Sequence, residues 1–298
     1  MLKDKDLIPT ESINPRTQKL GSSSAKQMAS MINAEDFNAA RTVKKAAASI
    51  AKTIDVAAKT FLSGGKIIFI GAGTSGRLGV LEAAECVPTF GIKPSQIIGI
   101  IAGGKKAMFR SQEGAEDDIP QGKKDILQQA RRGDLVLGLT ASGTTPYVLA
   151  ALQAAKKQGC TTVLIACNPK ADTAQADIFI LLETGAEVLS GSTRMKAGTA
   201  TKMALNAIST GAMARAGKVY GNLMVDVQPT NKKLVKRALR LICNIAQVNE
   251  KIAEKLLKQS DGNVKTAVVM HLKKLNKKQA VSLLNKHNGF LEEALHDR

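Results

Sequence analysis

The stretch KIIFIGAGTSGRLGVLEAAECVPTF, residues 66–90, decides the fold that this sequence predicts. Its apolar, β-branched opening at 66–70 predicts a buried strand, the glycine-rich segment 71–76 a tight turn, and the remainder a helix ending near Pro88. The first amides of a helix have no partner within the helix, and the helix dipole favours negative charge there. This order of elements therefore predicts an anion site.

Two features of the turn indicate which anion it would hold. Its glycines fit the GxGxxG pattern of dinucleotide-binding folds: Gly71, Gly73 and Gly76. That pattern also needs an acidic residue about 20 residues further on to bind a ribose, yet the next predicted strand, 96–101, runs into Ala-Gly-Gly. Thr74 and Ser75 can instead donate hydrogen bonds to a terminal phosphate. We therefore favour a phosphomonoester over a dinucleotide.

The composition is that of an ordinary globular protein. Of the 298 residues, 44% are hydrophobic and 23% charged, which suits one large domain or one domain plus a small one. No apolar run reaches the roughly 18 residues of a membrane span, and the N-terminus lacks the apolar stretch of a secretory signal. The four cysteines form no CxxC pair and the three histidines lie near the C-terminus. We expect a cytoplasmic protein with free thiols, no metal and no membrane partner.

The formal net charge of +18 is concentrated toward the C-terminus. Residues 231–298 hold fifteen Lys and Arg against six Asp and Glu, a net +9. A basic tail can bind nucleic acid by neutralising phosphates, but this one has a single aromatic residue, Phe290, and so no stacking platform for bases. We favour a solvated helical surface and expect no nucleic-acid partner.

Strand and helix patterns alternate through most of the chain. After an irregular 1–23, an Ala-rich stretch at 25–62 predicts two helices, with Glu35 and Asp36 suited to a first turn. Five short apolar strands follow, separated by helical patterns, which predicts an α/β fold with a three-layer parallel sheet covered by helices on both faces. The strands are predicted at 66–70, 96–101, 134–139, 161–166 and 177–182, and the helices at 75–87, 105–118, 121–132, 146–158 and within 185–216.

The segment DLVLGLTASGTTP, residues 134–146, repeats the first unit: a strand, a hydroxyl-rich turn and a helix with Pro146 in its first turn. Serine and threonine at a helix start are usually only caps. Two such turns at the carboxyl ends of parallel strands make a stronger case, because ligands of open α/β sheets bind at that edge. We expect one phosphate to be bound from two sides by Gly73, Thr74, Ser75, Ser142, Gly143, Thr144 and Thr145.

The alternation of strand and helix patterns ends at about residue 216, and only helical patterns follow. A connector at 221–231 leads into a helix at 232–247, and three short helical segments follow, with breaks at Gly262 and Asn276. The segments are predicted at 249–259, 263–273 and 277–296. We expect a small three-helix module that serves packing or dimerisation, and hence two domains, 1–230 and 231–298.

Acidic residues near a suspected anion site need an explanation in so basic a chain. Glu82 and Glu85 lie three residues apart on the first predicted helix and so share a face, and a second group is the run EGAEDD at 113–118. A carboxylate beside a bound phosphate is repelled, which favours its protonated form and suits it to proton transfer. The alternative is a solvated acidic face, and spacing alone does not decide between them.

The ordered set of motifs resembles one family over nearly the whole chain. The chain is similar to the N-acetylmuramic acid 6-phosphate etherases, which are built on the sugar isomerase (SIS) domain. The matching segments are GAGTSGRLGVLEAAECVPTFG, IAGG (101–104), EGAEDD, TASGTTPY (140–147), CNP (167–169), GAEVLSGSTRMKAGTATKMALN (185–206), KVYGNLMVDV (218–227) and GNVKTAVVM (262–270).

The resemblance implies a reaction and two acidic residues. The family removes the D-lactyl ether from C3 of the muramic sugar phosphate, giving N-acetylglucosamine 6-phosphate and D-lactate, in the recycling of peptidoglycan sugars. The family's acid and base fall on Glu85 and Glu116: by analogy Glu116 takes the C2 proton, and Glu85 protonates lactate and then activates water. The sugar aldehyde delocalises the charge, so the resemblance implies no cofactor.

Spacing adds an expectation about the assembly. Ser75 and Glu85 lie ten residues apart on one predicted helix, a rise of roughly 15 Å. A hexose phosphate does not easily span that length along its own phosphate-binding helix. We therefore expect a homodimer in which Glu85 acts at the site of the second subunit.

Other interpretations stay open at this point. The turns would equally serve a phosphosugar isomerase, or a non-enzymatic sugar-phosphate sensor or regulator such as a relative of glucokinase regulatory protein. A regulator would need a helix-turn-helix, and 1–62 shows no convincing one. Near 191–202, Ser192 is expected to cap a helix carrying three basic residues that are either ligand groups or surface charges: Arg194, Lys196 and Lys202.

Overall fold

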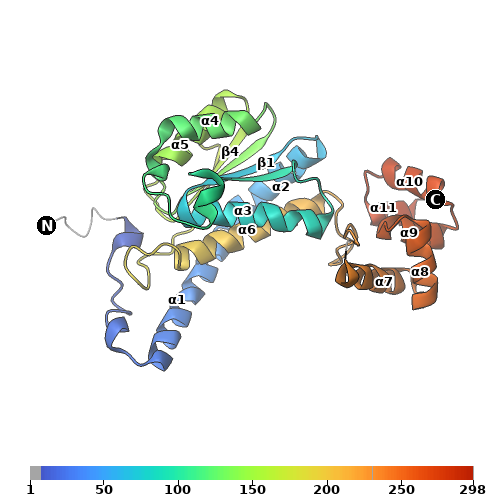
Figure 1. Cartoon of the computed structure of the whole chain (residues 1–298), viewed down its shortest axis with the longest axis horizontal. Helices are drawn as coiled ribbons and strands as arrows, with labels where there is room; N and C mark the ends of the chain where they lie inside the picture. The colour runs from blue at the N-terminus through green and yellow to red at the C-terminus, as the bar shows by residue number, and fades with distance from the viewer. Residues whose placement is uncertain (1–7, 230, 298) are drawn as a thin grey trace. The chain divides into compact units, whose positions relative to one another are not determined.

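A computed structural model describes residues 8–229 and 231–297 of the chain (Figure 1). The chain divides into two compact units: one comprises the residues up to Ala84 together with Pro94–Ser209, and the other comprises Glu85–Lys93 and the residues from Thr210 onward. The predicted boundary between 230 and 231 stays a prediction. Residues 1–7, which belong to the expected irregular N-terminus without a secretory signal, lie outside the described residues.

A five-stranded parallel sheet forms the centre of the first unit and confirms the predicted α/β class. Its strands follow the spatial order β2-β1-β3-β4-β5, and every neighbouring pair is parallel. β1 and β3 are buried along their whole length, as expected of strands covered on both faces. The strands are β1 (Ile67–Gly71), β2 (Ile97–Ile101), β3 (Leu135–Leu139), β4 (Thr161–Ala166) and β5 (Ile178–Leu181).

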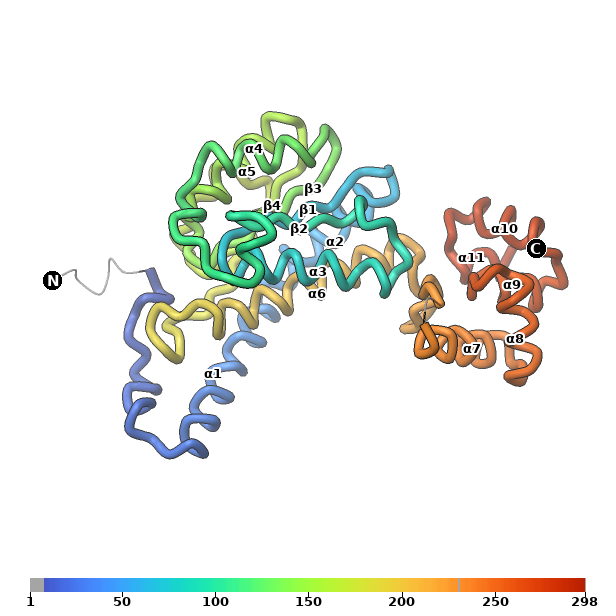
Figure 2. The backbone as a smooth tube through the Cα atoms, viewed as in Figure 1, coloured from blue at the N-terminus to red at the C-terminus, as the bar shows by residue number. Residues whose placement is uncertain are grey.

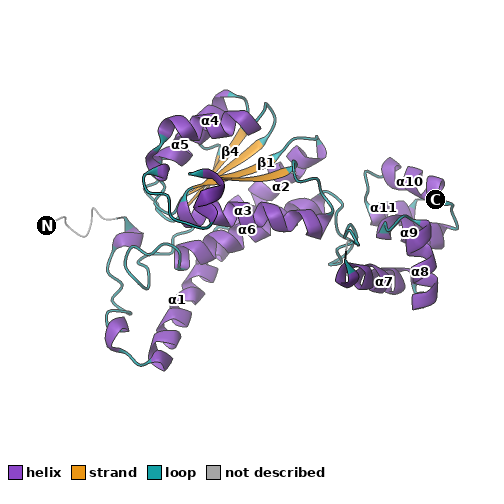
Figure 3. Ribbon diagram, in the orientation of Figure 1, coloured by secondary structure: helices purple, strands orange, loops and turns teal. Residues whose placement is uncertain are grey.

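Helices cover both faces of this sheet (Figure 3). On one face α4 and α5 bury an apolar cluster that includes Ile68, Val136 and Leu164 of the strands with Ile126 and Leu152 of the helices. On the other face lie α2 and the first-unit parts of α3 and α6 (Figure 1). The helices are α1 (Ala25–Lys45), α2 (Ala47–Leu62), α3 (Gly73–Phe90), α4 (Ile119–Gln129), α5 (Pro146–Lys157) and α6 (Lys196–Arg215).

The predicted pair of helices at 25–62 is present, but Glu35 lies elsewhere than expected. α1 begins after Ser24, whose side chain accepts a hydrogen bond from the backbone N–H of Gln27 in a capping box. The break between α1 and α2 falls at Ala46. Glu35 is therefore in the middle of α1, where it is 2% exposed, and the expectation of a first-turn position is wrong.

The helix predicted at 105–118 is also wrong. Only two short 3₁₀ turns occupy this stretch, η4 (Gly104–Met108) and η5 (Ala115–Asp117). Three glycines adopt left-handed backbone angles here and so interrupt any regular helix: Gly103, Gly104 and Gly114. The result is an irregular loop between β2 and α4, and Asp118 caps α4 by accepting the amide of Gln121.

The C-terminal part of the second unit is helical and has its own apolar core. After the expected first helix come four short helices rather than three, because Asn288 and Gly289, both with positive φ, end the segment predicted at 277–296 as one helix. Buried Lys265 donates hydrogen bonds from Nζ to Asp226 Oδ2 and to the carbonyl oxygens of Gly217 and Gly289. The helices are α7 (Lys232–Ala246), α8 (Glu250–Gln259), α9 (Val264–Lys273), α10 (Lys277–Lys286) and α11 (Leu291–His296).

Two sequence-level expectations concern membranes and thiols. Among the described residues, no helix has both the length and the apolar character needed to cross a bilayer. None of the four cysteines, all of them among the described residues, forms a disulfide, and burial raises the pKa of Cys160 to about 11 and that of Cys167 to about 12. These two thiols are therefore protonated and unreactive near neutral pH.

Candidate active site

The two hydroxyl-rich turns lie side by side because their strands are neighbours. β1 and β3 pair in parallel, with Gly71 opposite Leu139 at their carboxyl ends. The strand order also reverses here, since β2 flanks β1 on one side and β3, β4 and β5 follow on the other. Open α/β sheets bind ligands at such a switch point.

Glycines allow the turn after β1 to be short, so that the helix begins two residues earlier than predicted. α3 begins at Gly73, which has φ +51°. A Cβ on Gly76 would lie 2.6 Å from the carbonyl oxygen of Gly71, so the strand end and the helix start touch through their backbones. The GxGxxG pattern is thus explained by backbone packing. Thr74 and Ser75 fall in the first turn of α3, where amides have no helical partner.

A buried threonine organises the second turn. The Oγ1 of Thr140 lies 2.7 Å from Oγ1 of Thr145 and 3.2 Å from Oγ of Ser142, and it accepts the amide of Gly143 at 3.2 Å. The amide of Thr144 donates to Oγ of Ser142 at 3.2 Å. Thr140 was not singled out from the sequence, although it opens the motif TASGTTPY.

Residues after β4 fix the same turn from behind. Asn168 Nδ2 donates to the carbonyl oxygen of Ser142 at 2.8 Å. Gly143 has φ +77°, and a Cβ there would lie 2.3 Å from Cβ of Ala171. The CNP motif at 167–169 therefore has a positioning role that its sequence did not reveal.

A cavity of about 280 Å³ brings the two turns and Glu116 together. Gly143 and Thr144, the other two predicted phosphate residues, are not among its lining residues: Gly143 is buried and Thr144 is exposed. The predicted residues that line it are Gly73, Thr74, Ser75, Ser142, Thr145 and Glu116.

The two predicted catalytic glutamates have different positions. Glu116 lies in η5, is exposed, and lines both this cavity and a second one of about 140 Å³. Glu85 is exposed on α3 and does not line the 280 Å³ cavity. Glu82, three residues before it, is 6% exposed and accepts hydrogen bonds from Asn206 and Ser209, so its role is structural.

The N-terminal segment forms part of the cavity wall, which the sequence did not predict. Thr10 and Glu11 line the cavity together with Gly191 and Thr193. The amide of Gly191 donates to the carbonyl oxygen of Thr10 at 3.0 Å, and Ser190 Oγ donates to that of Glu11 at 2.8 Å. In Figure 2 this first part of the chain runs beside the loop that precedes α6.

The basic residues near 191–202 prove to have different roles. Lys196 is 0% exposed, and its Nζ lies 2.6 Å from Oε2 of Glu35, so it is neither a surface charge nor a free ligand group. Arg194 and Lys202 are exposed. Lys202 donates to the side chain of Asn206.

Two buried carboxylates anchor the start of α6. Glu187, not Ser192, caps the helix: it accepts the amides of Lys196 and Ala197 at 2.9 Å each. Glu35 also pairs with Arg16. The hydrogen bond from Arg16, reinforced by Lys196 and opposed by burial, lowers the pKa of Glu35 to about 2.

Fold and site together define a protein of the SIS-domain class. A family model described as the SIS domain matches residues 117–210, and one described as the glucokinase regulatory protein N-terminal SIS domain matches residues 49–156. Among solved structures, phosphoheptose isomerase from Neisseria gonorrhoeae aligns with 64% of this chain and 100% of its own at 19% identity and a TM-score of 0.44.

Curated relatives narrow the class to one family. The chain is 46% identical over 296 residues to N-acetylmuramic acid 6-phosphate etherase 2 of Vibrio parahaemolyticus, covering 99% of both chains. It is 48% identical over 288 residues to N-acetylmuramic acid 6-phosphate etherase of Yersinia pestis, covering 96% of this chain and 98% of that one. This chain belongs to the N-acetylmuramic acid 6-phosphate etherase family, which is a family of enzymes.

Proposed function

We propose that this enzyme removes the D-lactyl ether from C3 of N-acetylmuramic acid 6-phosphate and releases N-acetylglucosamine 6-phosphate and D-lactate. The observation that carries the proposal is the single cavity that holds both hydroxyl-rich turns and Glu116. The names of relatives aligned over 96–99% of the chain support the substrate. We place the reaction in the cytoplasm, in the recycling of cell-wall sugars.

The two turns suit a phosphate. The amides at the start of α3 and the hydroxyls of Thr74 and Ser75 offer donors from one side. Ser142 and Thr145 offer hydroxyls from the other, already oriented by Thr140. A dianionic group between these donors would leave the sugar carbons to extend toward the rest of the cavity.

The proposed chemistry is an elimination followed by hydration. In the open-chain sugar, the C1 aldehyde acidifies the proton on C2. The carboxylate of Glu116 takes this proton as the C3–O bond breaks, a C2–C3 double bond forms, and Glu85 gives a proton to the departing lactate oxygen. Glu85 then takes a proton from water as the water oxygen adds to C3, and Glu116 returns a proton to C2.

The position of Glu85 supports a shared site. Ser75 and Glu85 lie on the continuous helix α3, and ten residues of helix rise roughly 15 Å. Glu85 is exposed. We therefore propose a homodimer in which each subunit supplies Glu85 to the phosphate turns of the other.

Isotopes from the solvent test the reaction. Lactate release in ¹⁸O-labelled heavy water should leave solvent oxygen at C3 and deuterium at C2 of the product, and Glu116→Gln should abolish both. Solvent oxygen in lactate instead would overturn elimination. Hydrogen transfer between C1 and C2 without lactate would indicate an isomerase.

A sensor or regulator would bind the sugar phosphate without turnover, and Glu116→Gln would leave that binding unchanged. The structure offers no support for a DNA-binding regulator. Within residues 8–62 the two long helices α1 and α2 are separated by a single residue, Ala46, so this described part has no helix-turn-helix.

A further inference from the structure

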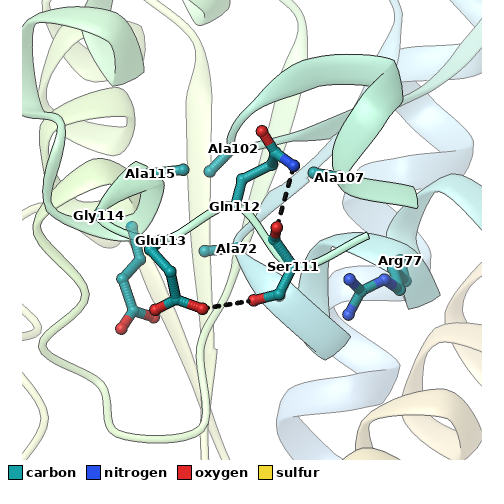
Figure 4. A pocket seen from close by; sticks show the side chains of 11 residues that line it. Ala72, Arg77, Ala102, Ala107, Ser111, Gln112, Glu113, Gly114 and Ala115 are labelled. Carbon is teal, nitrogen blue, oxygen red and sulfur yellow. Dashed lines mark hydrogen bonds between the residues drawn. The ribbon is translucent and has the colours of Figure 1, made fainter. Parts of the chain in front are cut away.

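A second, smaller cavity adjoins the phosphate cavity. It has a volume of about 140 Å³, and the two cavities share Ala72, Gly73 and Glu116 as lining residues. The loop between β2 and α4 supplies much of the wall of this second cavity (Figure 4). A group attached to a sugar that lies beside Glu116 could therefore extend directly into it.

The lining of this second cavity combines methyl groups with one guanidinium. Four alanines line it, and two of them, Ala102 and Ala107, are 2% and 4% exposed, so their methyl groups belong to the core. Among the described residues that line it, Arg77 carries the only positive charge. The lining thus combines alanine methyl groups with one cation, and it also includes two acids, Glu113 and Glu116.

Arg77 is held in place by one hydrogen bond, and within the described part of the chain its other N–H groups have no partner. Its Nε donates to the carbonyl oxygen of Met108 at 3.2 Å, which fixes the guanidinium against η4. No ion pair joins Arg77 to an acid within the part of the chain that the structure describes. A planar guanidinium with free N–H groups binds a carboxylate by two parallel hydrogen bonds.

The acidic residues that line this cavity do not pair with the guanidinium of Arg77. Glu113 accepts a hydrogen bond from Ser111 Oγ at 3.0 Å. Figure 4 shows Glu113 on the side of the pocket opposite Arg77, with Ser111 between them. Arg77 thus lines the cavity, and neither Glu113 nor Glu116 nor any other acid among the described residues forms an ion pair with its guanidinium.

We propose that this second cavity is the subsite for the D-lactyl group, with Arg77 binding its carboxylate and the alanines enclosing its methyl group. The inference rests on the proposed function and names the part of the site that would select an acid-bearing substituent at C3. Because Glu116 borders both cavities, C2 and C3 lie at their junction, beside the carboxylate that takes the C2 proton.

The test separates lactyl binding from phosphate binding. Arg77→Met should raise the KM for N-acetylmuramic acid 6-phosphate at least about tenfold, the usual loss for a charged hydrogen bond. The inhibition constant of N-acetylglucosamine 6-phosphate, which lacks the lactyl group, should change less than about twofold. With a substrate whose lactyl carboxylate is converted to the amide, wild type and Arg77→Met should have similar KM values.

A matched control and the contrary outcomes complete the experiment. Lys105→Met removes an exposed charge from η4 outside both cavities and should leave both constants unchanged. Equal weakening of substrate and N-acetylglucosamine 6-phosphate by Arg77→Met, or an unchanged KM, would overturn the lactyl subsite. A wild-type enzyme that releases no D-lactate would instead overturn the proposed function.

Discussion

The Nζ atom of Lys196 lies 2.6 Å from Oε2 of Glu35, and both side chains are almost completely buried. Lys196 is the first residue of α6, and Glu35 lies in the middle of α1, 161 residues earlier. Arg16 pairs with the same carboxylate. One carboxylate thus joins the N-terminal segment, α1 and α6 within the first unit.

Removing the ammonium should destabilise the fold. Lys196→Met leaves Arg16 as the one cation that pairs with the buried Glu35 carboxylate among the described residues. Breaking a buried pair in this way costs about 3 kcal/mol of unfolding free energy. Urea denaturation followed by circular dichroism measures the change. Lys202→Met, on the exposed side of the same helix, is the control and should shift stability by less than about 0.5 kcal/mol. Equal effects of the two substitutions would show that the buried pair contributes nothing specific.

The carboxylate of Glu35 should also make the free energy of unfolding depend on pH. The folded-state pKa of Glu35 is about 2, below its ordinary value of 4.5, so its contribution is present above the ordinary value and disappears as pH falls toward 2. Urea midpoints at about pH 6 and about pH 3 should differ less for Glu35→Gln than for wild type. An identical difference in the two proteins would contradict the assignment.

The turn after β3 offers a test of phosphate binding within a single loop. Ser142 lines the 280 Å³ cavity, whereas Thr144 does not. Ser142→Ala should therefore raise the KM for the sugar phosphate at least about tenfold, the value of one hydrogen bond to a charged group, while Thr144→Ala should have a smaller effect. Inhibition by inorganic phosphate provides a second readout. Equal effects at both positions would mean that the substrate contacts the turn differently.

Mixed dimers test the shared site. A chain carrying Glu85→Gln is co-expressed with a chain carrying Ser75→Ala and Ser142→Ala, each with its own affinity tag. If Glu85 serves the partner's turns, the mixed dimer contains one site with both parts intact and should recover activity that neither homodimer has. Mixed dimers as inactive as the two parents would place the whole site within one chain.

The close approach of β1 and α3 predicts a position that tolerates no side chain. Gly76→Ala would place a Cβ 2.6 Å from the carbonyl oxygen of Gly71 and 2.7 Å from Ile101 Cγ1. Moving this backbone should cost more than about 2 kcal/mol and weaken substrate binding as well. Gly21→Ala, with nothing within 4 Å and no positive φ, is the control. A stable Gly76→Ala enzyme with normal KM would contradict the packing explanation.

The sequence predicted the sheet because the signals for it are local. Each strand is a short apolar run, and each turn carries its glycines or hydroxyls within a few residues of the strand end, as at Gly71 and Ser142. The position of both turns at one edge follows from parallel pairing alone. The parallel sheet of five strands could therefore be predicted, whereas its strand order could not. Of the seven residues expected to bind phosphate, five line the 280 Å³ cavity.

The features that were missed depend on contacts between distant residues. Nothing near Glu35 indicates that Lys196 will pair with it, and a helix-start interpretation was the natural one for two adjacent acids. Thr140 and Asn168 look like a strand end and a loop until their hydrogen bonds to the Ser142 turn are seen. The loop at 103–117 differs from the predicted helix for another reason: three glycines with positive φ interrupt it.

The wall formed by Thr10 and Glu11 has a consequence for biosynthesis. Ser190, which binds the carbonyl oxygen of Glu11, follows it by 179 residues, so nearly two thirds of the chain must leave the ribosome before that wall can close. The sheet strands emerge earlier and can pair as they appear. The 280 Å³ cavity is therefore among the last parts of the first unit to mature, even though some of the first residues to be translated line it.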